Sequence, residues 1–153
     1  MVLLSGPEPQ RTLLEKKLIT ELEKSPKEIL FVKGIVESRQ EIEKVNTITY
    51  YNFMDSEQLS IAFNESEVVV CRSGYTTVMD LAKLEKKAFF IPTPGQYEQE
   101  YLAKKFKSEI IAPSCKQEKF KVSKLEKIHF YKGFNDYSIE TKWNELFSLF
   151  QSK

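Results

Sequence analysis

The sequence is poor in the residues on which metal centres, disulfide frameworks and histidine-based catalysis depend. It contains two cysteines, one histidine and one tryptophan among 153 residues. Cys71 falls in a buried-strand pattern and Cys115 in a polar segment, which predicts neither a disulfide framework nor a zinc site and fits a reducing cytoplasm. His129 lacks a nucleophile or carboxylate partner at a recognisable spacing. We therefore expect a structural or exposed histidine, no metal and no cofactor.

Long apolar runs and an excess of one charge are also lacking. No run approaches the ~20 apolar residues that a membrane-spanning helix needs, and the N-terminal segment is too short for a signal peptide. The 23 basic and 22 acidic side chains give a formal net charge of +1, so bulk electrostatics predicts no nucleic-acid partner. Lysines do cluster at residues 83–87 and 104–107. Solvated helix faces explain both clusters, and contact with an anionic membrane surface is the alternative.

Short apolar runs alternate with helical periodicities along the chain. The runs predict strands at Val2–Leu4, Ile29–Val32, Thr47–Tyr51, Val68–Cys71, Ala88–Ile91 and Ile110–Ala112. Leucines spaced by four predict a helix before Pro26, and further helices are expected after Asp55, after Gly74, around Tyr101 and at the chain end, where Trp143, Leu146, Phe147 and Phe150 form an apolar stripe. Segment 34–44 is polar and predicts a turn with a short helix or a loop.

Continuously apolar strands that alternate with helices predict a parallel sheet covered on both faces. We therefore predict an α/β fold, a Rossmann-like three-layer sandwich of about six strands, in a single domain over residues 1–153. Ligands bind such sheets at the carboxyl ends of the strands. The segments that follow the predicted strands are consequently the places to seek a site.

The most informative of these segments runs from residue 68 to residue 81, V-V-V-C-R-S-G-Y-T-T-V-M-D-L. A β-branched run ends at Ser73-Gly74, and a hydroxyl-rich helix begins at once. Free N–H groups and the helix dipole suit an anion such as phosphate. Gly74 is expected to use a positive φ at the turn, and Asp80 follows within reach of a sugar hydroxyl. The alternative is an ordinary turn with Ser73 as the N-cap.

Two other segments accompany it. The loop P-T-P-G-Q-Y-E-Q-E, at residues 92–100, offers Gln96, Glu98 and Gln99 as hydrogen-bonding partners for sugar hydroxyls, or else simply caps the next helix. Residues 5–11 look like a phosphate loop interrupted by prolines, which lack an N–H, or a plain helix start. Neither the dinucleotide pattern G-x-G-x-x-G nor the Walker pattern is present.

At these residues the chain resembles the donor-binding half of a GT-B glycosyltransferase, and specifically the MurG-type enzymes of family 28. Their signature is a strand, then S-R-A-G-A-x-T-x-x-E, then V-P-x-x-x-x-x-Q-x-x-N-A. The corresponding segments here are C-R-S-G-Y-T-T-V-M-D at 71–80 and I-P-T-P-G-Q-Y-E-Q-E-Y-L-A at 91–103. The resemblance extends over roughly residues 2–112.

The resemblance implies roles for individual residues. Gly74, Tyr75, Thr76 and Thr77 would cradle the donor diphosphate, and Asp80 would accept hydrogen bonds from the ribose. Glu98 and Gln99 would contact the transferred sugar, while Phe53 and Met54 would border the base. The full set of expected substrate-binding residues is Gly6, Phe53, Met54, Arg72, Ser73, Gly74, Tyr75, Thr76, Thr77, Asp80, Gln96, Glu98 and Gln99. Because prolines interrupt the first loop, we expect few phosphate contacts there.

A GT-B enzyme has two such halves, and the resemblance covers one. It implies a UDP-sugar donor, with UDP-N-acetylhexosamine expected, and a catalytic base in the acceptor-binding half or a separate subunit. No catalytic residue is therefore expected in this chain, and this half alone is expected to be inactive. We expect a cytoplasmic protein, with membrane association at the inner face through its partner. The alternatives are a non-catalytic donor-binding subunit recruited by a membrane-bound partner and a nucleotide-sugar epimerase-like domain.

Overall fold

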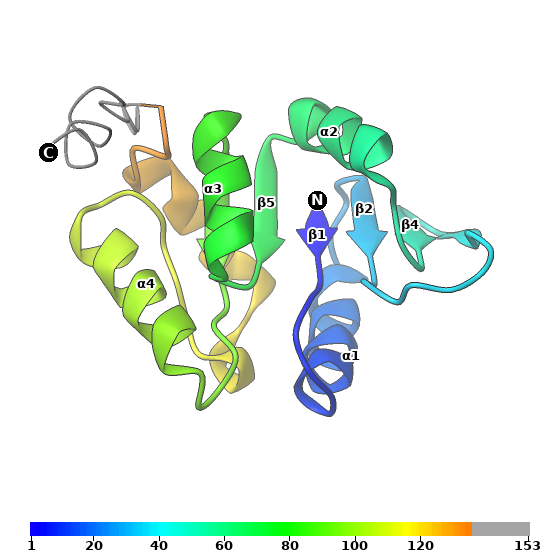
Figure 1. Cartoon of the computed structure of the whole chain (residues 1–153), viewed down its shortest axis with the longest axis horizontal. Coiled ribbons are helices and arrows are strands. Elements are labelled where there is room, and N and C mark those ends of the chain that lie inside the picture. The colour runs from blue at the N-terminus through cyan, green and yellow to red at the C-terminus, as the bar shows by residue number, and fades with distance from the viewer. Residues whose placement is uncertain (136–153) are drawn as a thin grey trace, which may run out of the picture.

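The computed structural model describes residues 1–135, so the predicted terminal helix with Trp143 lies outside the described residues. A six-stranded sheet runs through the centre of this part in the order β3-β4-β2-β1-β5-β6 (Figure 1). The strands are β1 (Val2–Leu3), β2 (Ile29–Val32), β3 (Ile42–Val45), β4 (Ile48–Tyr51), β5 (Val68–Cys71) and β6 (Lys87–Phe90). All neighbouring pairs are parallel except β3 with β4.

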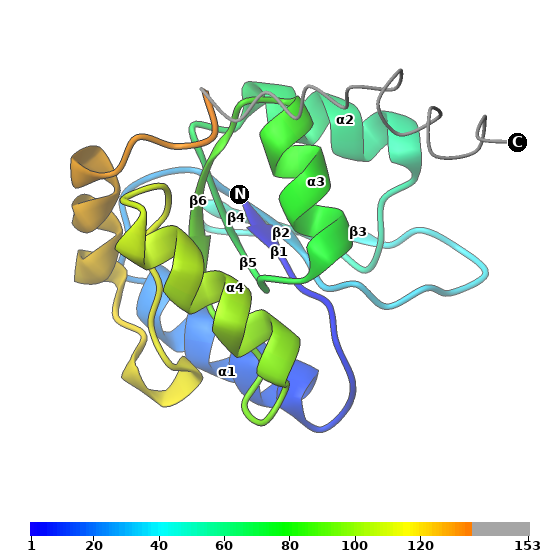
Figure 2. The same ribbon diagram turned by 60° about the vertical axis from the view of Figure 1, so that its left-hand side comes forward.

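Helices cover both faces of the sheet, which confirms the predicted three layers. The helices are α1 (Gln10–Leu22), α2 (Ser56–Glu65), α3 (Tyr75–Lys83), α4 (Tyr97–Ser108) and the 3-10 helices η1 (Gln117–Lys119) and η2 (Val122–Phe130). One core contains buried side chains of α1 and η2, together with Phe120, which follows η1. The other core contains buried side chains of α2, α3 and α4. Figure 2 shows α1 on one side of the sheet and α2 with α3 on the other.

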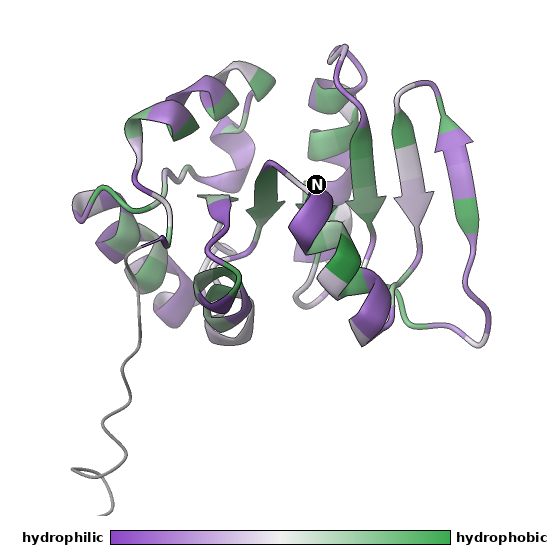
Figure 3. Ribbon diagram, turned by 90° about the horizontal axis from the view of Figure 1, so that it is seen from above, coloured by the Kyte–Doolittle hydropathy of each residue, from purple (hydrophilic) through white to green (hydrophobic). Residues whose placement is uncertain are grey.

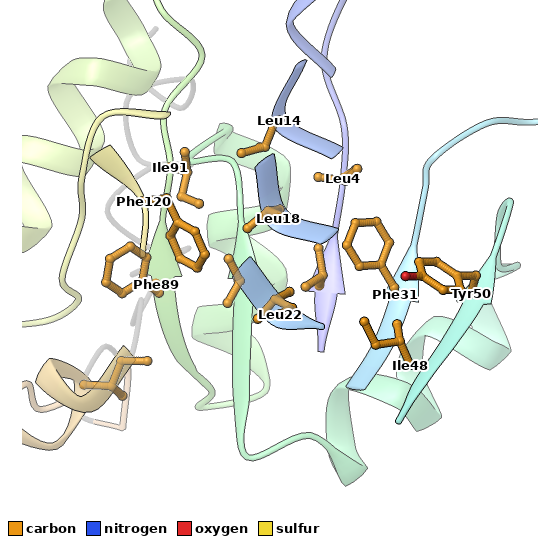
Figure 4. Packing of buried hydrophobic residues seen from close by; sticks show 13 residues of the cluster. Leu4, Leu14, Leu18, Leu22, Phe31, Ile48, Tyr50, Phe89, Ile91 and Phe120 are labelled. Carbon is orange, nitrogen blue, oxygen red and sulfur yellow. The ribbon is translucent and has the colours of Figure 1, made fainter. Parts of the chain in front are cut away.

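The leucines of α1 show how the sequence places a helix on the sheet. Leu14, Leu18 and Leu22 recur every four residues and are at most 3% exposed, because this spacing puts them on one helix face. They pack toward Phe31 and Ile48 of neighbouring strands (Figure 4). Burying a leucine side chain stabilises the fold by roughly 1.5–3 kcal/mol. This helix therefore holds its place mainly through three residues.

Two predicted elements are wrong in instructive ways. Residues 42–45, which begin inside segment 34–44, predicted to be a turn with a short helix or a loop, form β3. This strand pairs antiparallel with β4 through a tight turn in which Asn46 has a φ of 52°. All four residues of β3 are exposed at the sheet edge, so its polar middle, visible in Figure 3, carries no buried-strand pattern. The predicted strand at Ile110–Ala112 is absent, because Ile110 has a φ of 58° and turns the chain out of α4.

The chain pairs with β6 only after that turn. Phe90 donates its N–H to Pro113 (2.9 Å) and accepts one from Cys115 (3.1 Å) across a parallel bridge. The short pairing covers part of the outer edge of β6, as edge strands require. The sheet is consequently mixed, with five parallel strands and one antiparallel strand at its far edge.

Candidate functional site

The strand order places a topological switch point between β1 and β5, and we refer to the space outside the carboxyl ends of these two strands as the crevice. The chain leaves β1 for α1 on one face and leaves β5 for α3 on the opposite face. Such a topological switch point leaves room outside the carboxyl ends of the two strands, where ligands of open α/β sheets bind. The loops that border this crevice are residues 4–9, after β1, and residues 72–74, after β5.

The N-terminus of α3 faces this position with its backbone N–H groups uncapped. Gly74 is the N-cap and supplies no side-chain hydrogen bond, and the first turn carries no acidic residue. By contrast, α2 is closed by a capping box of Asp55 and Gln58. The start of α1 is also occupied, because Glu8 accepts the N–H of Thr12 at 3.2 Å. Free N–H groups together with the positive end of the helix dipole favour an anion at α3.

The N-terminus of α4 is less suited to an anion. Its first turn carries Glu98 and Glu100, and Glu100 accepts the N–H of Gly95 at 3.0 Å. Two carboxylates already complement the dipole there and would repel a phosphate. Among the four α-helices of residues 1–135, α3 therefore has the start best suited to a phosphate.

Gly74 has a different conformation from the one expected. Its φ is −73° and its ψ 147°, ordinary extended backbone, so the prediction of a positive φ is wrong. A Cβ at this position would meet no atom within 4 Å. The glycine is not required by its neighbours, and its effect is to leave both the space and the N–H groups in front of α3 free.

Arg72, which is expected among the ligand contacts, lies beneath this surface. The side chain is 1% exposed and donates to the carbonyls of Ile91 (3.0 Å), Pro92 (3.1 Å) and Gln10 (2.9 Å) and to the side chain of Gln117 (2.8 Å). Burial lowers the pKa of this guanidinium to about 10. Arg72 thus joins the loops after β5 and β6 to the start of α1.

Ser73 likewise makes a hydrogen bond to a neighbouring segment of the chain. It is fully buried, and its hydroxyl donates to the carbonyl of Gln99 at 2.7 Å. The Gln99 amide oxygen in turn accepts the N–H of Thr93 at 2.9 Å, and its NH₂ donates to the side chain of Gln96. Gln96 and Gln99 therefore brace the loop after β6, whereas Glu98 on the same helix turn is exposed.

Thr93 is a site residue that the sequence reasoning did not single out. It is 2% exposed, and its hydroxyl has no hydrogen-bond partner among residues 1–135. A Cβ at Gly6, which has a φ of 102°, would lie 3.5 Å from this hydroxyl. The loops after β1 and β6 therefore meet at an unsatisfied polar group, which costs roughly 1–3 kcal/mol when nothing binds it. Its place between Pro92 and Pro94 was the available signal.

Phe53 and Met54 follow β4, farther along the same edge of the sheet. Both are half-buried. Three strand spacings, about 14 Å, separate β4 from β5 in the sheet order. An isolated phosphate cannot bridge this distance, whereas an extended nucleotide can, so these two residues and α3 suit opposite ends of one ligand.

Asn52 holds the neighbouring loop and was also missed. It is 7% exposed; its oxygen accepts the N–H groups of Glu41 (2.8 Å) and Phe53 (2.9 Å), and its NH₂ donates to the carbonyl of Arg39 (2.9 Å) and the side chain of Glu37 (3.0 Å). The loop after β2 is thereby fixed beside Phe53. A single asparagine directly after a strand carries no pattern from which this role can be predicted.

The exposed hydroxyls and carboxylate of α3 share one helix surface. Thr76 and Asp80 are exposed, Thr77 is half-buried, and Tyr75 is 63% exposed. Spacings of three and four residues place Thr76 and Thr77 beside Asp80. The helix start therefore offers N–H donors and hydroxyls, with one acceptor carboxylate a turn away, and this combination matches a phosphorylated sugar.

Other chemistries find little support in the described part of the chain. Burial raises the pKa of the Cys71 thiol to about 12, so this cysteine is not a nucleophile at neutral pH. His129 is exposed, as expected. Residues 1–135 contain no cluster of three histidine, cysteine or acidic side chains that could hold a metal ion. None of the described helices is long and apolar enough to span a bilayer.

The chain forms a Rossmann-like α/β domain, and comparison with known proteins identifies its family. Residues 10–129 match the glycosyltransferase family 28 C-terminal domain, and the chain belongs to this family. The predicted resemblance to MurG-type enzymes is thereby confirmed.

Particular relatives agree with this assignment. The chain is 31% identical over 80 residues to the UDP-N-acetylglucosamine--N-acetylmuramyl-(pentapeptide) pyrophosphoryl-undecaprenol N-acetylglucosamine transferase of Haemophilus influenzae strain PittEE, covering 51% of this chain and 22% of that enzyme. The enzyme of strain 86-028NP is 32% identical over 82 residues, which cover 52% of this chain and 23% of that enzyme. The chain thus matches less than a quarter of these relatives' length.

A solved structure supports the fold. The crystal structure of Acinetobacter baumannii MurG superposes with a TM-score of 0.68 and 18% sequence identity, over 98% of this chain and 48% of that one. The Rossmann-like α/β fold predicted from the sequence is therefore confirmed, and it corresponds to about half of that enzyme.

Proposed function

We propose that this domain binds the nucleotide-sugar donor of a glycosyltransferase, a UDP-sugar and specifically a UDP-N-acetylhexosamine. The observation that carries the proposal is the uncapped, acid-free start of α3 at the switch point. The diphosphate would accept hydrogen bonds from the N–H groups of Tyr75, Thr76 and Thr77 and from the threonine hydroxyls. The N-acetylglucosamine transferases with which the chain shares sequence favour this sugar.

The remaining contacts follow from positions along the sheet edge. Phe53 and Met54 would border the base, Asp80 would accept hydrogen bonds from the ribose, and Glu98 would face the transferred sugar. Thr93 would donate its free hydroxyl to a phosphate or sugar oxygen that enters between the loops after β1 and β6. Binding would then satisfy a buried group that is unpaired in the free protein.

The reaction would be direct displacement at the anomeric carbon of the sugar. An acceptor hydroxyl forms the new glycosidic bond, the bond to the diphosphate breaks, and UDP leaves with the bonding electrons. The start of α3 would stabilise the negative charge that develops on the leaving diphosphate. The base that takes the proton of the acceptor would come from an acceptor-binding domain or subunit, so residues 1–153 alone would show no transfer. Contact with a membrane would likewise come through that partner.

Calorimetric titration with UDP and UDP-N-acetylglucosamine tests the proposal. We expect saturable binding that Thr77→Ala and Asp80→Asn each weaken about tenfold, which corresponds to the roughly 1.4 kcal/mol of one modest hydrogen bond to a charged or sugar group. Matched controls are Thr20→Ala on the exposed side of α1 and Glu65→Gln at the end of α2, which should leave affinity unchanged. Absence of binding at millimolar ligand, or equal losses in the controls, would overturn the assignment.

A further inference from the structure

A cavity lies at the β6 end of the sheet, outside the proposed donor site. It has a volume of about 310 Å³ and is lined by Phe89 of β6, the end of α4, the segment after Pro113, and the 3-10 helices. Figure 2 shows η2, in orange, at this end of the sheet, far from α2. The floor is formed by the chain that pairs with β6 through Ser114.

Every charged residue that lines this cavity is a lysine. Its charged members are Lys107, Lys116, Lys119, Lys124 and Lys127, with no acidic side chain among the lining residues. None of these five lysines lies within 4.0 Å of a carboxylate in residues 1–135, whereas lysines elsewhere do form such pairs. The chain as a whole is nearly neutral, so this concentration of positive charge is local.

Neighbouring segments bring these lysines to one cavity. Lys116 precedes η1 and Lys119 is its last residue, whereas Lys124 and Lys127 lie on η2, which is anchored through Ile128, a buried member of the core. Repulsion among like charges makes such an arrangement unfavourable in the free protein, and a bound anion would remove that repulsion. A cavity of this size holds a diphosphate with room for water.

The cavity is separate from the donor site. α4 begins at the carboxyl edge of the sheet, beside the loop after β6, and Lys107 lies near its other end. None of the loops that border the crevice between β1 and β5 contributes a lining residue. An anion in this cavity therefore occupies a different place from a nucleotide at the start of α3.

We propose that the lysine-lined cavity binds a phosphate or diphosphate group, carried on an anionic lipid head group or free in solution. A cluster of flexible lysines recognises phosphate as compact charges and needs no base or sugar contact. Binding should weaken steeply with salt, because the ammonium groups are mostly exposed and screened.

Two probes test this proposal and identify the source of the phosphate. Inorganic pyrophosphate is titrated into the labelled chain, with amide shifts followed by NMR. Vesicles of phosphatidylcholine with 30% phosphatidylglycerol are used in sedimentation, against pure phosphatidylcholine. We expect saturable shifts at Ser114, Lys119 and Lys124 with pyrophosphate, or sedimentation with the anionic vesicles only. The first result identifies a soluble phosphate ligand and the second a lipid head group.

A charge-matched pair of variants decides whether the cavity is responsible. Lys119→Gln/Lys124→Gln/Lys127→Gln should weaken binding at least tenfold. The control Lys16→Gln/Lys83→Gln/Lys104→Gln removes the same charge from exposed positions that do not line the cavity and should change it less than twofold. Equal losses in both variants, or binding of neither probe by the unmodified chain, would overturn the proposal. Shifts confined to residues 74–77 would also overturn the cavity proposal while supporting the donor site. Shifts confined to the cavity would support the cavity proposal and count against the donor site.

Discussion

The free start of α3 predicts opposite changes in stability and donor binding when a cap is supplied. Gly74 already has the extended backbone of an N-cap residue, so Gly74→Ser needs no rearrangement. The serine hydroxyl would accept the N–H of Thr76 or Thr77. The same substitution would occupy donors that we assign to the diphosphate. This single substitution thus tests whether α3 lacks a side-chain cap because its free N–H groups bind the ligand.

The magnitudes follow from the local geometry. Serine exceeds glycine at an N-cap by a few tenths of a kcal/mol. Gly74 has an ordinary backbone conformation and open space at its Cβ. Replacing such a glycine stabilises the folded state by a further ~0.4–1 kcal/mol, because it reduces the conformational entropy of the unfolded chain. The sum is roughly 0.5–1.5 kcal/mol, or a rise in Tm of about 1–6 °C for a domain of this size. Losing one charged hydrogen bond costs roughly 1.5–3 kcal/mol of binding, which is about ten- to a hundredfold in Kd.

Urea denaturation and calorimetric titration with UDP measure the two effects. Gly74→Ala is the matched control, because it adds the Cβ without an acceptor and should leave donor affinity closer to that of the unmodified chain. If Gly74→Ser binds UDP within twofold of the original, the start of α3 is not the phosphate site. If both variants lose affinity equally, occupancy of space and not competition for the N–H groups is the cause.

Three further predictions concern buried polar groups. Arg72→Met should destabilise the fold by about 3–5 kcal/mol, because three carbonyls and Gln117 lose a buried charged donor. The control Arg39→Met, at an exposed side chain, should change the free energy of unfolding measured in urea by less than about 0.5 kcal/mol. Asn52→Ala should speed amide hydrogen exchange at Glu41 and Phe53, its two N–H donors, and unchanged exchange would refute its role. Burial lowers the pKa of the Met1 amine to about 6, below its value in the unfolded chain. Because the unfolded chain then binds more protons, the free energy of unfolding should rise by roughly 1–2 kcal/mol from pH 6 to pH 8. N-terminal acetylation should abolish that rise.

Much of the fold was accessible from the sequence because its strands are buried on both faces. The runs at residues 29–32 and 68–71 are apolar throughout, since helices cover both sides of the sheet. The exposed strand β3 escaped prediction for the converse reason, because a solvated edge strand with Glu43 and Lys44 in its middle needs no apolar pattern. The false strand at Ile110–Ala112 arose because the apolar run is a helix exit, in which Ile111 and Ala112 are buried without pairing.

The site divides in the same way. Its location could be predicted, because a strand end, a glycine and a hydroxyl-rich helix start occur together in residues 68–81. The division of labour within that segment could not. Arg72 and Thr77 are both polar residues in this segment of the sequence, and the packing of the loop after β6 decides that the guanidinium points inward. Thr93 is similar, because its unpaired hydroxyl is a property of two loops that meet in space.

The position of Arg72 has a consequence for how quickly a ligand can be captured. One guanidinium ties together a strand end, the next loop along the sheet and the first helix, so these segments are ordered when the chain folds and not when a ligand arrives. The entropy of arranging them is then absent from the binding step. Association at this edge should be a single encounter, with an observed rate that increases linearly with ligand concentration and shows no plateau from a slow rearrangement. If the domain works with an acceptor-binding partner as we propose, a receiving surface held in this way leaves any large movement to the approach of that partner.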